Sequence, residues 1–181
     1  TADVLAAGTR LQVVGRAGTG VDNIDVEAAT RRGIVVVNAP TSNTIAVAEH
    51  TMALMLALAR HICEANSGLH EGRWEKQRLM GTELRGKTLG LVGLGRVGQA
   101  VATRARAMDM RVVAYDPFMS PERAGQLSVE LVGMDDLLAQ ADYVSLHAPV
   151  TSSTRGMIGR RELAMMKQGA RLVNCARGEL V

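Results

Sequence analysis

The sequence predicts an α/β protein built around a doubly wound parallel sheet, with part of a second α/β domain preceding it in the chain. Three observations lead to this prediction. Short apolar runs alternate with amphipathic segments along most of the 181 residues. A glycine-rich turn at 93–98 joins one apolar run to an amphipathic segment. The apolar content of 47% is ordinary for a chain that buries a globular core.

The first 43 residues are expected to form a fragment of a parallel sheet. Apolar runs at 11–14 and 34–38 predict two strands, and residues 25–32 predict a short helix between them. This βαβ fragment has no earlier strands to pair with, so we expect only part of a domain. The glycines within 15–20 lack the spacing of a dinucleotide turn, and no cofactor turn is predicted there.

A long helix is predicted from residue 45 to about residue 68. Pro40 breaks the preceding pattern, and the polar residues that follow it can cap a helix start. Apolar residues occur on several faces of this helix: Ala46, Ala48, Met52, Leu54, Met55, Leu56 and Leu58. Such a helix is expected to cross between domains or to form a subunit interface, so we expect a homodimer. The polar stretch 71–86 is predicted to be a hinge or an exposed loop.

The next segments have the order of a dinucleotide site. Residues 88–92 predict a buried strand that runs directly into the glycine turn. Gly93 would form the tight turn, Gly95 would let the backbone approach a pyrophosphate, and Gly98 would let the helix pack against the strand. The helix that begins near Arg96 offers N–H groups and the positive end of its dipole to phosphates. This order predicts a Rossmann-type dinucleotide site.

The following strand ends in an acidic residue. Residues 111–115 predict that strand, and Asp116 comes directly after it. A carboxylate at this position can accept hydrogen bonds from the adenosine ribose hydroxyls, and it repels the additional phosphate of NADP. The sequence therefore predicts NAD as the cofactor.

The alternation of strands and helices continues to the end of the sequence. Helices are predicted at 135–140 and 160–167, and strands at 143–147 and 170–174. Because the predicted sheet looks unfinished at both ends, we expect the chain to be a piece of a larger protein.

Three regions follow from these elements. Residues 1–43 are expected to be a partial substrate domain, and 44–86 a domain-crossing helix with a hinge. Residues 87–181 are expected to be an NAD-binding Rossmann domain that is incomplete at its C-terminus.

Composition excludes several classes of function. Four scattered aromatic residues do not form stacking platforms for nucleic acid, and a net charge of +3 without a basic stripe favours a small anionic substrate. Neither Cys63 nor Cys175 lies in a metal-ligand or disulfide pattern, so no metal is expected. The sequence lacks a signal-peptide pattern and an apolar run long enough for a bilayer. We expect a cytoplasmic protein without nucleic-acid or membrane partners.

Several segments, taken together, resemble the D-isomer-specific 2-hydroxyacid dehydrogenases. The similarity spans almost the whole chain and is carried by residues 15–23, 72–75, 86–90, 93–98, 115–117, 146–149 and 173–178. It implies a Rossmann domain beside a flavodoxin-like substrate domain. It also implies NAD-dependent oxidation of a D-2-hydroxy acid, with 3-phosphoglycerate at the entry to serine biosynthesis as the expected substrate.

The resemblance assigns roles to individual positions in the cofactor site. Arg96 and Val97 resemble the family's pyrophosphate contacts, and Asp116 resembles its ribose carboxylate. Thr19 and Gly20 resemble the loop that offers backbone N–H groups to cofactor and substrate.

The nicotinamide half of the pocket is assigned in the same way. The backbone positions that resemble its lining are Ala148, Cys175 and Ala176. Arg177 resembles the catalytic arginine, which borders the cofactor as well. A permanently charged planar guanidinium can hold a substrate carboxylate and polarise the C2 carbonyl.

The chain also departs from the family. The family completes its site with a glutamate and a histidine that lie beyond the catalytic arginine, whereas this sequence ends four residues after Arg177. His147 is either an acid–base residue or a histidine that lines the pocket. Arg16, Asn43 and Lys76 are candidates for the carboxylate and phosphate of the substrate, and each could instead be a solvated charge or a cap.

Two alternatives remain open at this point. One is a non-catalytic NAD-binding interaction module, as in the transcriptional corepressors that share this fold. The other is a dehydrogenase for a related 2-hydroxy acid, such as one that acts on glyoxylate or hydroxypyruvate.

Overall fold

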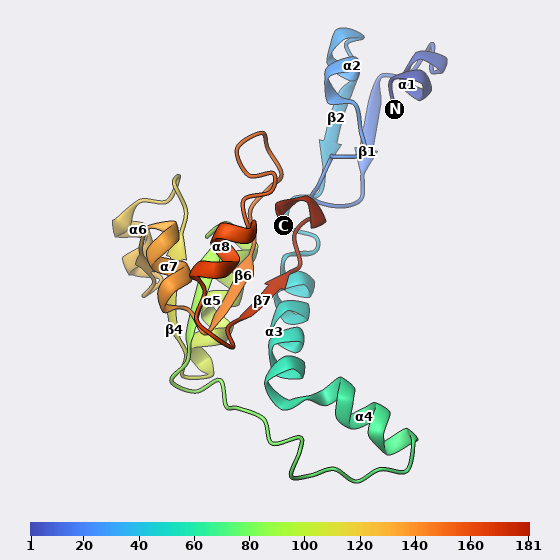
Figure 1. The fold of residues 1–181 in the computed structure, drawn as a ribbon. Helices are drawn as coiled ribbons and strands as arrows, with labels where there is room; N and C mark the ends of the chain where they lie inside the picture. The colour runs from blue at the N-terminus through green and yellow to red at the C-terminus, as the bar shows by residue number, and fades with distance from the viewer. The chain divides into compact units, whose positions relative to one another are not determined.

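The computed structural model describes all of residues 1–181, which divide into two compact units, Thr1–Ile45 and Ala46–Val181 (Figure 1). The boundary lies near the end of the predicted partial substrate domain. The assignment of 44–86 as a crossing helix and hinge stays a prediction.

The first unit is a small βαβ fragment with one additional helix. Strands β1 (Val13–Arg16) and β2 (Val35–Asn38) pair in parallel, and α2 (Val26–Arg31) connects them. Asp25 caps α2 by accepting a hydrogen bond from the backbone N–H of Ala28 at 2.8 Å. Helix α1 (Ala2–Ala7) was not predicted, and the first strand begins two residues later than expected. The core of this unit consists of Leu5, Ala28, Ala29 and Ile34.

The second unit contains a five-stranded parallel sheet in the order β5-β4-β3-β6-β7. Its strands are β3 (Thr88–Val92), β4 (Arg111–Tyr115), β5 (Glu130–Leu131), β6 (Tyr143–Leu146) and β7 (Arg171–Asn174). The predicted bounds of β3 and β4 are confirmed, and those of β6 and β7 are each one residue too long. The short strand β5 and helix α6 (Pro121–Gln126) before it were not predicted.

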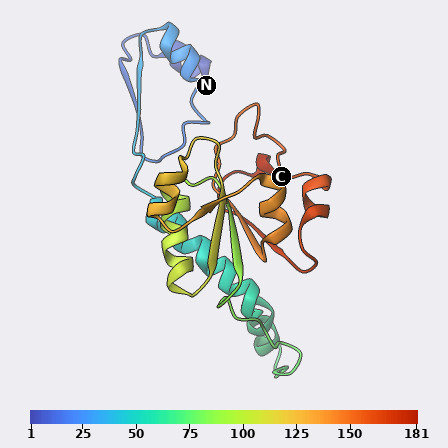
Figure 2. The same cartoon turned by 90° about the vertical axis from the view of Figure 1, so that its left-hand side faces the viewer.

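Helices cover both faces of this sheet, which confirms the doubly wound prediction (Figure 2). Helices α3 (Thr44–Arg60) and α5 (Arg96–Ala107) pack on one face, and α7 (Met134–Gln140) and α8 (Arg160–Met165) lie on the other. The 3-10 helix η1 (Gly178–Leu180) ends the chain and buries Leu180 in the core beneath α7. Strand β3 is buried along its whole length, as expected for a central parallel strand.

The predicted single helix from 45 to 68 is wrong, because it breaks at His61. Helix α4 (Ile62–His70) continues from α3 at an angle of 65°, and His61 has a φ of 53°. The physical reason is a tertiary contact. The Ala59 carbonyl, which residue 63 would use in a continuous helix, accepts instead from the Thr82 N–H at 2.8 Å.

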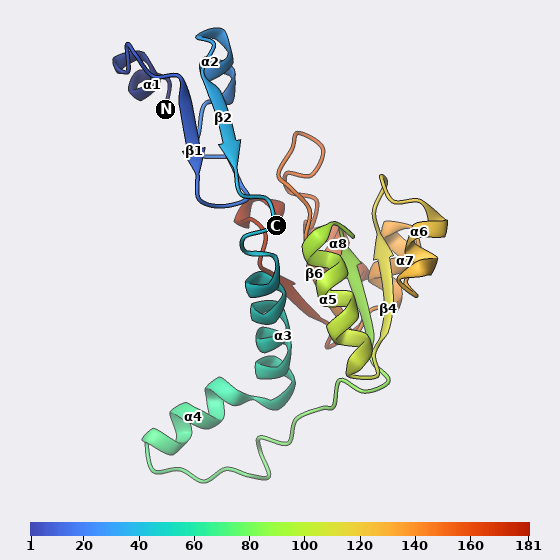
Figure 3. The same cartoon turned by 180° about the vertical axis from the view of Figure 1, so that it is seen from behind.

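Helix α3 is a core helix of the second unit. It buries Ala48, Thr51, Met52, Met55 and Ala59 against the sheet and α5. No helix of the chain is by itself long and apolar enough to cross a membrane; α3 and α4 reach that length only as a bent pair. Residues 71–86 contain no helix or strand and return the chain from α4 to β3, as Figure 3 shows from behind.

Candidate cofactor and active site

The carboxyl ends of four neighbouring strands meet at one edge of the sheet. Because β4, β3, β6 and β7 are parallel and adjacent, the residues that follow them lie along the same edge. These residues are Asp116, Gly93, His147 and Cys175. Ligands of open α/β sheets bind at this edge. The structure thus brings most of the predicted cofactor residues together.

The glycine turn is shaped by close backbone contacts. Gly93 has a φ of 98°, and a Cβ atom there would lie 2.8 Å from the carbonyl oxygen of His147. A Cβ on Gly98 would collide with the carbonyl oxygen of Gly93. Both positions therefore exclude a side chain. In contrast, a Cβ on Gly95 would meet no atom within 4 Å, so the space above the turn is open.

The N-terminus of α5 faces this open space. Gly95 is its N-cap and supplies no side-chain hydrogen bond to the first turn. The backbone N–H groups at Arg96 and Val97 start the helix, where the positive end of the dipole favours an anion. These residues fit the pyrophosphate of a dinucleotide.

Asp116 holds the glycine turn from the side of β4. Its Oδ2 accepts a hydrogen bond from the Leu94 N–H at 2.7 Å, and its Oδ1 accepts from the Phe118 N–H at 2.9 Å. The carboxylate is half-buried at the end of β4. Its position suits the ribose contact that the sequence predicts, and its bond to Leu94 is an additional structural role that the sequence did not reveal.

Arg177 is held at the end of β7 by a compact network. The side chain of Asn174 donates from Nδ2 to the Arg177 carbonyl at 2.7 Å, and its Oδ1 accepts from the Ala176 N–H at 3.0 Å. Nη1 of Arg177 donates to the Ala176 carbonyl at 2.8 Å. Asn174 thereby fixes the backbone from which the guanidinium projects.

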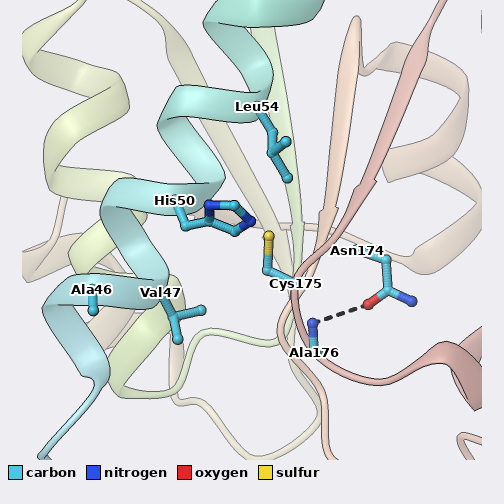
Figure 4. A pocket seen from close by; sticks show the side chains of 7 residues that line it. All are labelled: Ala46, Val47, His50, Leu54, Asn174, Cys175 and Ala176. Carbon is cyan, nitrogen blue, oxygen red and sulfur yellow. Dashed lines mark hydrogen bonds between the residues drawn. The ribbon is translucent and has the colours of Figure 1, made fainter.

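An open pocket of about 470 Å³ lies between α3 and the end of β7 (Figure 4). Its lining consists of Ala46, Val47, His50, Leu54, Asn174, Cys175 and Ala176. In Figure 4 the His50 ring is directed toward Cys175. His50 was not predicted from the sequence as a pocket residue. The spacing of Ala46, His50 and Leu54 by four residues was the available signal, because it places them on one helix face.

His147 is a poor proton carrier at neutral pH. Its Nε2 lies 2.9 Å from the Oγ of Ser145, which is fully buried in β6. Burial lowers the pKa of His147 to about 4. The imidazole is therefore neutral at pH 7, which favours the interpretation of a pocket-lining histidine over that of a general acid.

The lowered pKa predicts a stability that depends on pH. In the unfolded chain His147 has an ordinary pKa near 6.5 and takes up a proton as the pH falls, whereas the folded protein takes it up only near pH 4. We expect stability to be lost progressively between pH 6.5 and 4, by roughly 3 kcal/mol from this group. Denaturant unfolding at several pH values measures this loss.

Two variants identify the source of the loss. His147→Gln should flatten the dependence over that range, and replacement of the exposed His70 by Asn should leave it unchanged. Equal slopes in wild type and His147→Gln would assign the acid sensitivity to other groups.

Four of the predicted substrate residues lie together in the first unit. Thr19 Oγ1 donates to Asn43 Oδ1 at 2.7 Å, and Arg16 Nε donates to the Gly20 carbonyl at 3.1 Å. Asn38, which was not predicted as a site residue, donates from Nδ2 to the Thr19 carbonyl at 2.7 Å. These bonds organise one loop around residues 16–20.

Lys76 lies elsewhere, in the second unit. It borders a small pocket beside α4, with Ala65, Leu69 and Trp74 among its neighbours. It is not among the residues that line the pocket at the end of β7. Its role as a substrate contact stays a prediction.

The glycine turn leads into a helix whose N-terminus has no side-chain cap, and a carboxylate stands at the end of the next strand. This arrangement defines a dinucleotide-binding domain of the dehydrogenase type. Residues 52–181 match the family model described as "D-isomer specific 2-hydroxyacid dehydrogenase, NAD binding domain". The chain belongs to this family, and NAD is its cofactor.

Two relatives with high sequence identity to the chain are both named D-3-phosphoglycerate dehydrogenase. The protein from Archaeoglobus fulgidus is 56% identical over 180 residues, covering 99% of this chain and 34% of that protein. The protein from Methanocaldococcus jannaschii is 53% identical over 182 residues, covering 100% of this chain and 35% of that protein. The chain therefore spans about a third of the length of these relatives.

Solved structures of related proteins have the same fold. The TT0316 protein from Thermus thermophilus has a TM-score of 0.92 at 43% identity, over 99% of this chain and 57% of that one. The D-lactate dehydrogenase from Aquifex aeolicus, complexed with NAD and lactic acid, has a TM-score of 0.90 at 31% identity, over 100% and 54%. A glyoxylate reductase from Paecilomyes thermophila has a TM-score of 0.90 at 36% identity, over 99% and 55%.

Proposed function

We propose that the protein containing this chain oxidises D-3-phosphoglycerate to 3-phosphohydroxypyruvate with NAD, at the entry to serine biosynthesis. The identity of 56% over 180 residues to a D-3-phosphoglycerate dehydrogenase is the observation that carries the proposal. The chain supplies the cofactor-binding core of that enzyme. A small anionic substrate also agrees with the net charge of +3.

The residues at the sheet edge have separate tasks in this proposal. The N-terminus of α5 binds the pyrophosphate, and Asp116 binds the adenosine ribose and selects against NADP. Backbone positions at Ala148, Cys175 and Ala176 line the nicotinamide half of the site. When bound there, NAD would supply the acceptor for the hydride on C2 of the substrate.

Arg177 acts on the substrate directly. Its guanidinium holds the carboxylate of the hydroxy acid and stabilises the negative charge that develops on the C2 oxygen. The loop that contains Arg16, Thr19 and Gly20, with Asn43 bonded to it, offers a cation and backbone N–H groups to the substrate. Lys76 is proposed as a further phosphate contact.

The proposal predicts that the 181 residues bind NAD but turn it over poorly. The resemblance places the acid–base histidine and its glutamate beyond Arg177, and the lowered pKa of His147, about 4, makes its imidazole a weak base. A positioned acid or base contributes about 10² to 10⁴-fold. We expect the full-length protein to form NADH with 3-phosphoglycerate at least about 10²-fold faster than these 181 residues alone.

Substrate preference is tested in the same assay. A panel of 3-phosphoglycerate, hydroxypyruvate, glyoxylate and D-lactate should show the highest kcat/KM for 3-phosphoglycerate. If the full-length protein prefers glyoxylate, then glyoxylate and not 3-phosphoglycerate would be its substrate. Binding of NAD without turnover of any member would favour the interaction module instead.

We further propose a homodimer that forms through α3, α4 and the segment after them. Large apolar side chains are exposed there: Leu54, Leu58, Ile62, Leu69, Trp74 and Met80, with exposed fractions from 36% to 78%. Exposed large apolar side chains on consecutive elements favour an association site, and two-fold symmetry is the commonest arrangement. The two cysteines are free, which agrees with the proposed cytoplasmic location.

Light scattering at micromolar concentration should report twice the mass of one chain. Leu69→Asp should shift the protein toward monomer, because a charge would be buried without a partner. Leu163→Asp is the matched control, since Leu163 is exposed to a similar extent on α8. A wild-type monomer, or equal behaviour of the two variants, would contradict this interface.

A further inference from the structure

The pair formed by Ser145 and His147 is a part-buried polar contact at the carboxyl end of β6. Ser145 is fully buried in β6, and its Oγ lies 2.9 Å from Nε2 of His147. Alternation along β6 places Ser145 and His147 on the same face as Tyr143, the face that α3 and α5 cover. The fully buried Ser145 hydroxyl would be costly there without a partner, and the half-buried His147 ring supplies one.

The backbone of His147 forms one wall of the glycine turn. Its N–H donates to the Val92 carbonyl at 2.8 Å, which extends the pairing of β6 with β3. The position of a Cβ on Gly93 lies 2.8 Å from the His147 carbonyl oxygen and 3.1 Å from the Ala148 nitrogen. The first turn of α5 is also close, because a Cβ on Gly98 would be 4.0 Å from the Cβ of His147.

The opposite wall of the turn belongs to β4. The Gly93 N–H donates to the Tyr115 carbonyl at 2.9 Å, and the Leu94 N–H donates to the Asp116 carboxylate. The turn is therefore hydrogen-bonded to β4 on one side, and on the other side the peptide of residues 147–148 leaves no room for a side chain at Gly93. If that peptide shifts, Gly93 and the turn that it begins are expected to shift with it.

We propose that Ser145 and His147 are positioning residues for the dinucleotide turn. Their hydrogen bond fixes the His147 side chain on the face of the sheet beneath α5. It thereby fixes the peptide of residues 147–148 against Gly93. In this role the pair acts through the backbone of the turn, because it sets the place of the N–H groups that meet the pyrophosphate. The inference rests on the NAD site and not on the choice of substrate.

Three variants separate this role from a general effect on folding. Ser145→Ala removes the partner of the imidazole, and His147→Phe keeps a ring without the hydrogen bond. His147→Gln retains a neutral polar group near the position of Nε2 and serves as the conservative rescue. Thr51→Ala is the matched control, because Thr51 is fully buried and loses a 2.9 Å bond to the Val47 carbonyl within α3.

The readout is the affinity of the folded chain for NAD⁺ and ADP-ribose, which contain the pyrophosphate, compared with that for adenosine, which lacks it. We expect Ser145→Ala and His147→Phe to weaken NAD⁺ and ADP-ribose about tenfold, the effect of one lost buried hydrogen bond. Adenosine affinity should stay unchanged. His147→Gln and Thr51→Ala should bind all three ligands as wild type does. Circular dichroism confirms that each variant is folded at the titration temperature.

Equal weakening for adenosine and NAD⁺ would overturn the proposal, because it would indicate a loss of folded protein or a shift of the whole sheet edge. Wild-type affinity in Ser145→Ala and His147→Phe would overturn it as well, and so would a His147→Gln variant as weak as His147→Phe. These titrations contain no 3-phosphoglycerate. A failure of the full-length protein to oxidise that acid would therefore leave their result valid.

Discussion

Replacement of Arg177 by Ala in the full-length protein should lower kcat with 3-phosphoglycerate by about 10² to 10³-fold, the cost of removing a donor aimed at a developing oxyanion. The guanidinium projects from a backbone that Asn174 holds through two hydrogen bonds. It is half-buried at the carboxyl end of β7, where partial exclusion of water strengthens its interactions. KM should rise as well, because the same group holds the substrate carboxylate.

Arg177→Lys distinguishes charge from geometry. Lysine keeps the positive charge but lacks the planar fork that binds a carboxylate through two parallel bonds, so its kcat should lie between those of wild type and Ala. Arg160→Ala is the matched control, since Arg160 is exposed at the start of α8. Steady-state kinetics with saturating NAD measures all three. Unchanged turnover in Arg177→Ala would remove this residue from the catalytic site.

Replacement of Asp116 by Ala should weaken NADH binding by about 1.5 to 3 kcal/mol, the usual cost of losing a hydrogen bond to a charged group. This corresponds to roughly a tenfold to hundredfold loss of affinity. The structure adds a second contribution, because Ala also leaves the Leu94 N–H without its 2.7 Å partner. Calorimetric titration with NADH and NADPH measures both affinities in the same chain.

Asp116→Asn separates the two contributions. An amide oxygen can still accept from Leu94, while the negative charge that repels the additional phosphate of NADPH is gone. Asn should therefore bind NADPH better than wild type does and lose less NADH affinity than Ala. Equal affinity of wild type for NADH and NADPH would contradict the role of Asp116 in selecting the cofactor.

The elements that depend on local pattern were predictable from the sequence. Strands β3 and β4 have their predicted bounds because each is a short apolar run, one bounded by Gly93 and the other by Asp116. The glycine turn was predictable for the same reason, since its residue types follow one another at a fixed spacing directly after a strand. Parallel pairing of β1 with β2 followed from the helix between them.

Features that depend on distant contacts were not predictable. The break at His61 follows from the bond between Thr82 and the Ala59 carbonyl, and those residues lie far apart in the sequence. The contact of Asp116 with Leu94 and that of Ser145 with His147 depend on side-chain directions that no periodicity specifies. Strand β5 has two residues, which is too short for an alternating pattern to appear.

The three glycines of the turn differ in what would be lost if each were replaced. At Gly98 a methyl group meets backbone, which cannot rotate away, so a library screened only for folded protein would already recover glycine alone. At Gly95 the same methyl group enters empty space, so packing does not exclude a side chain there. Only a screen for bound dinucleotide would recover glycine there. A screen for folding and a screen for binding would thus show that Gly98 is needed for the fold and Gly95 for the ligand.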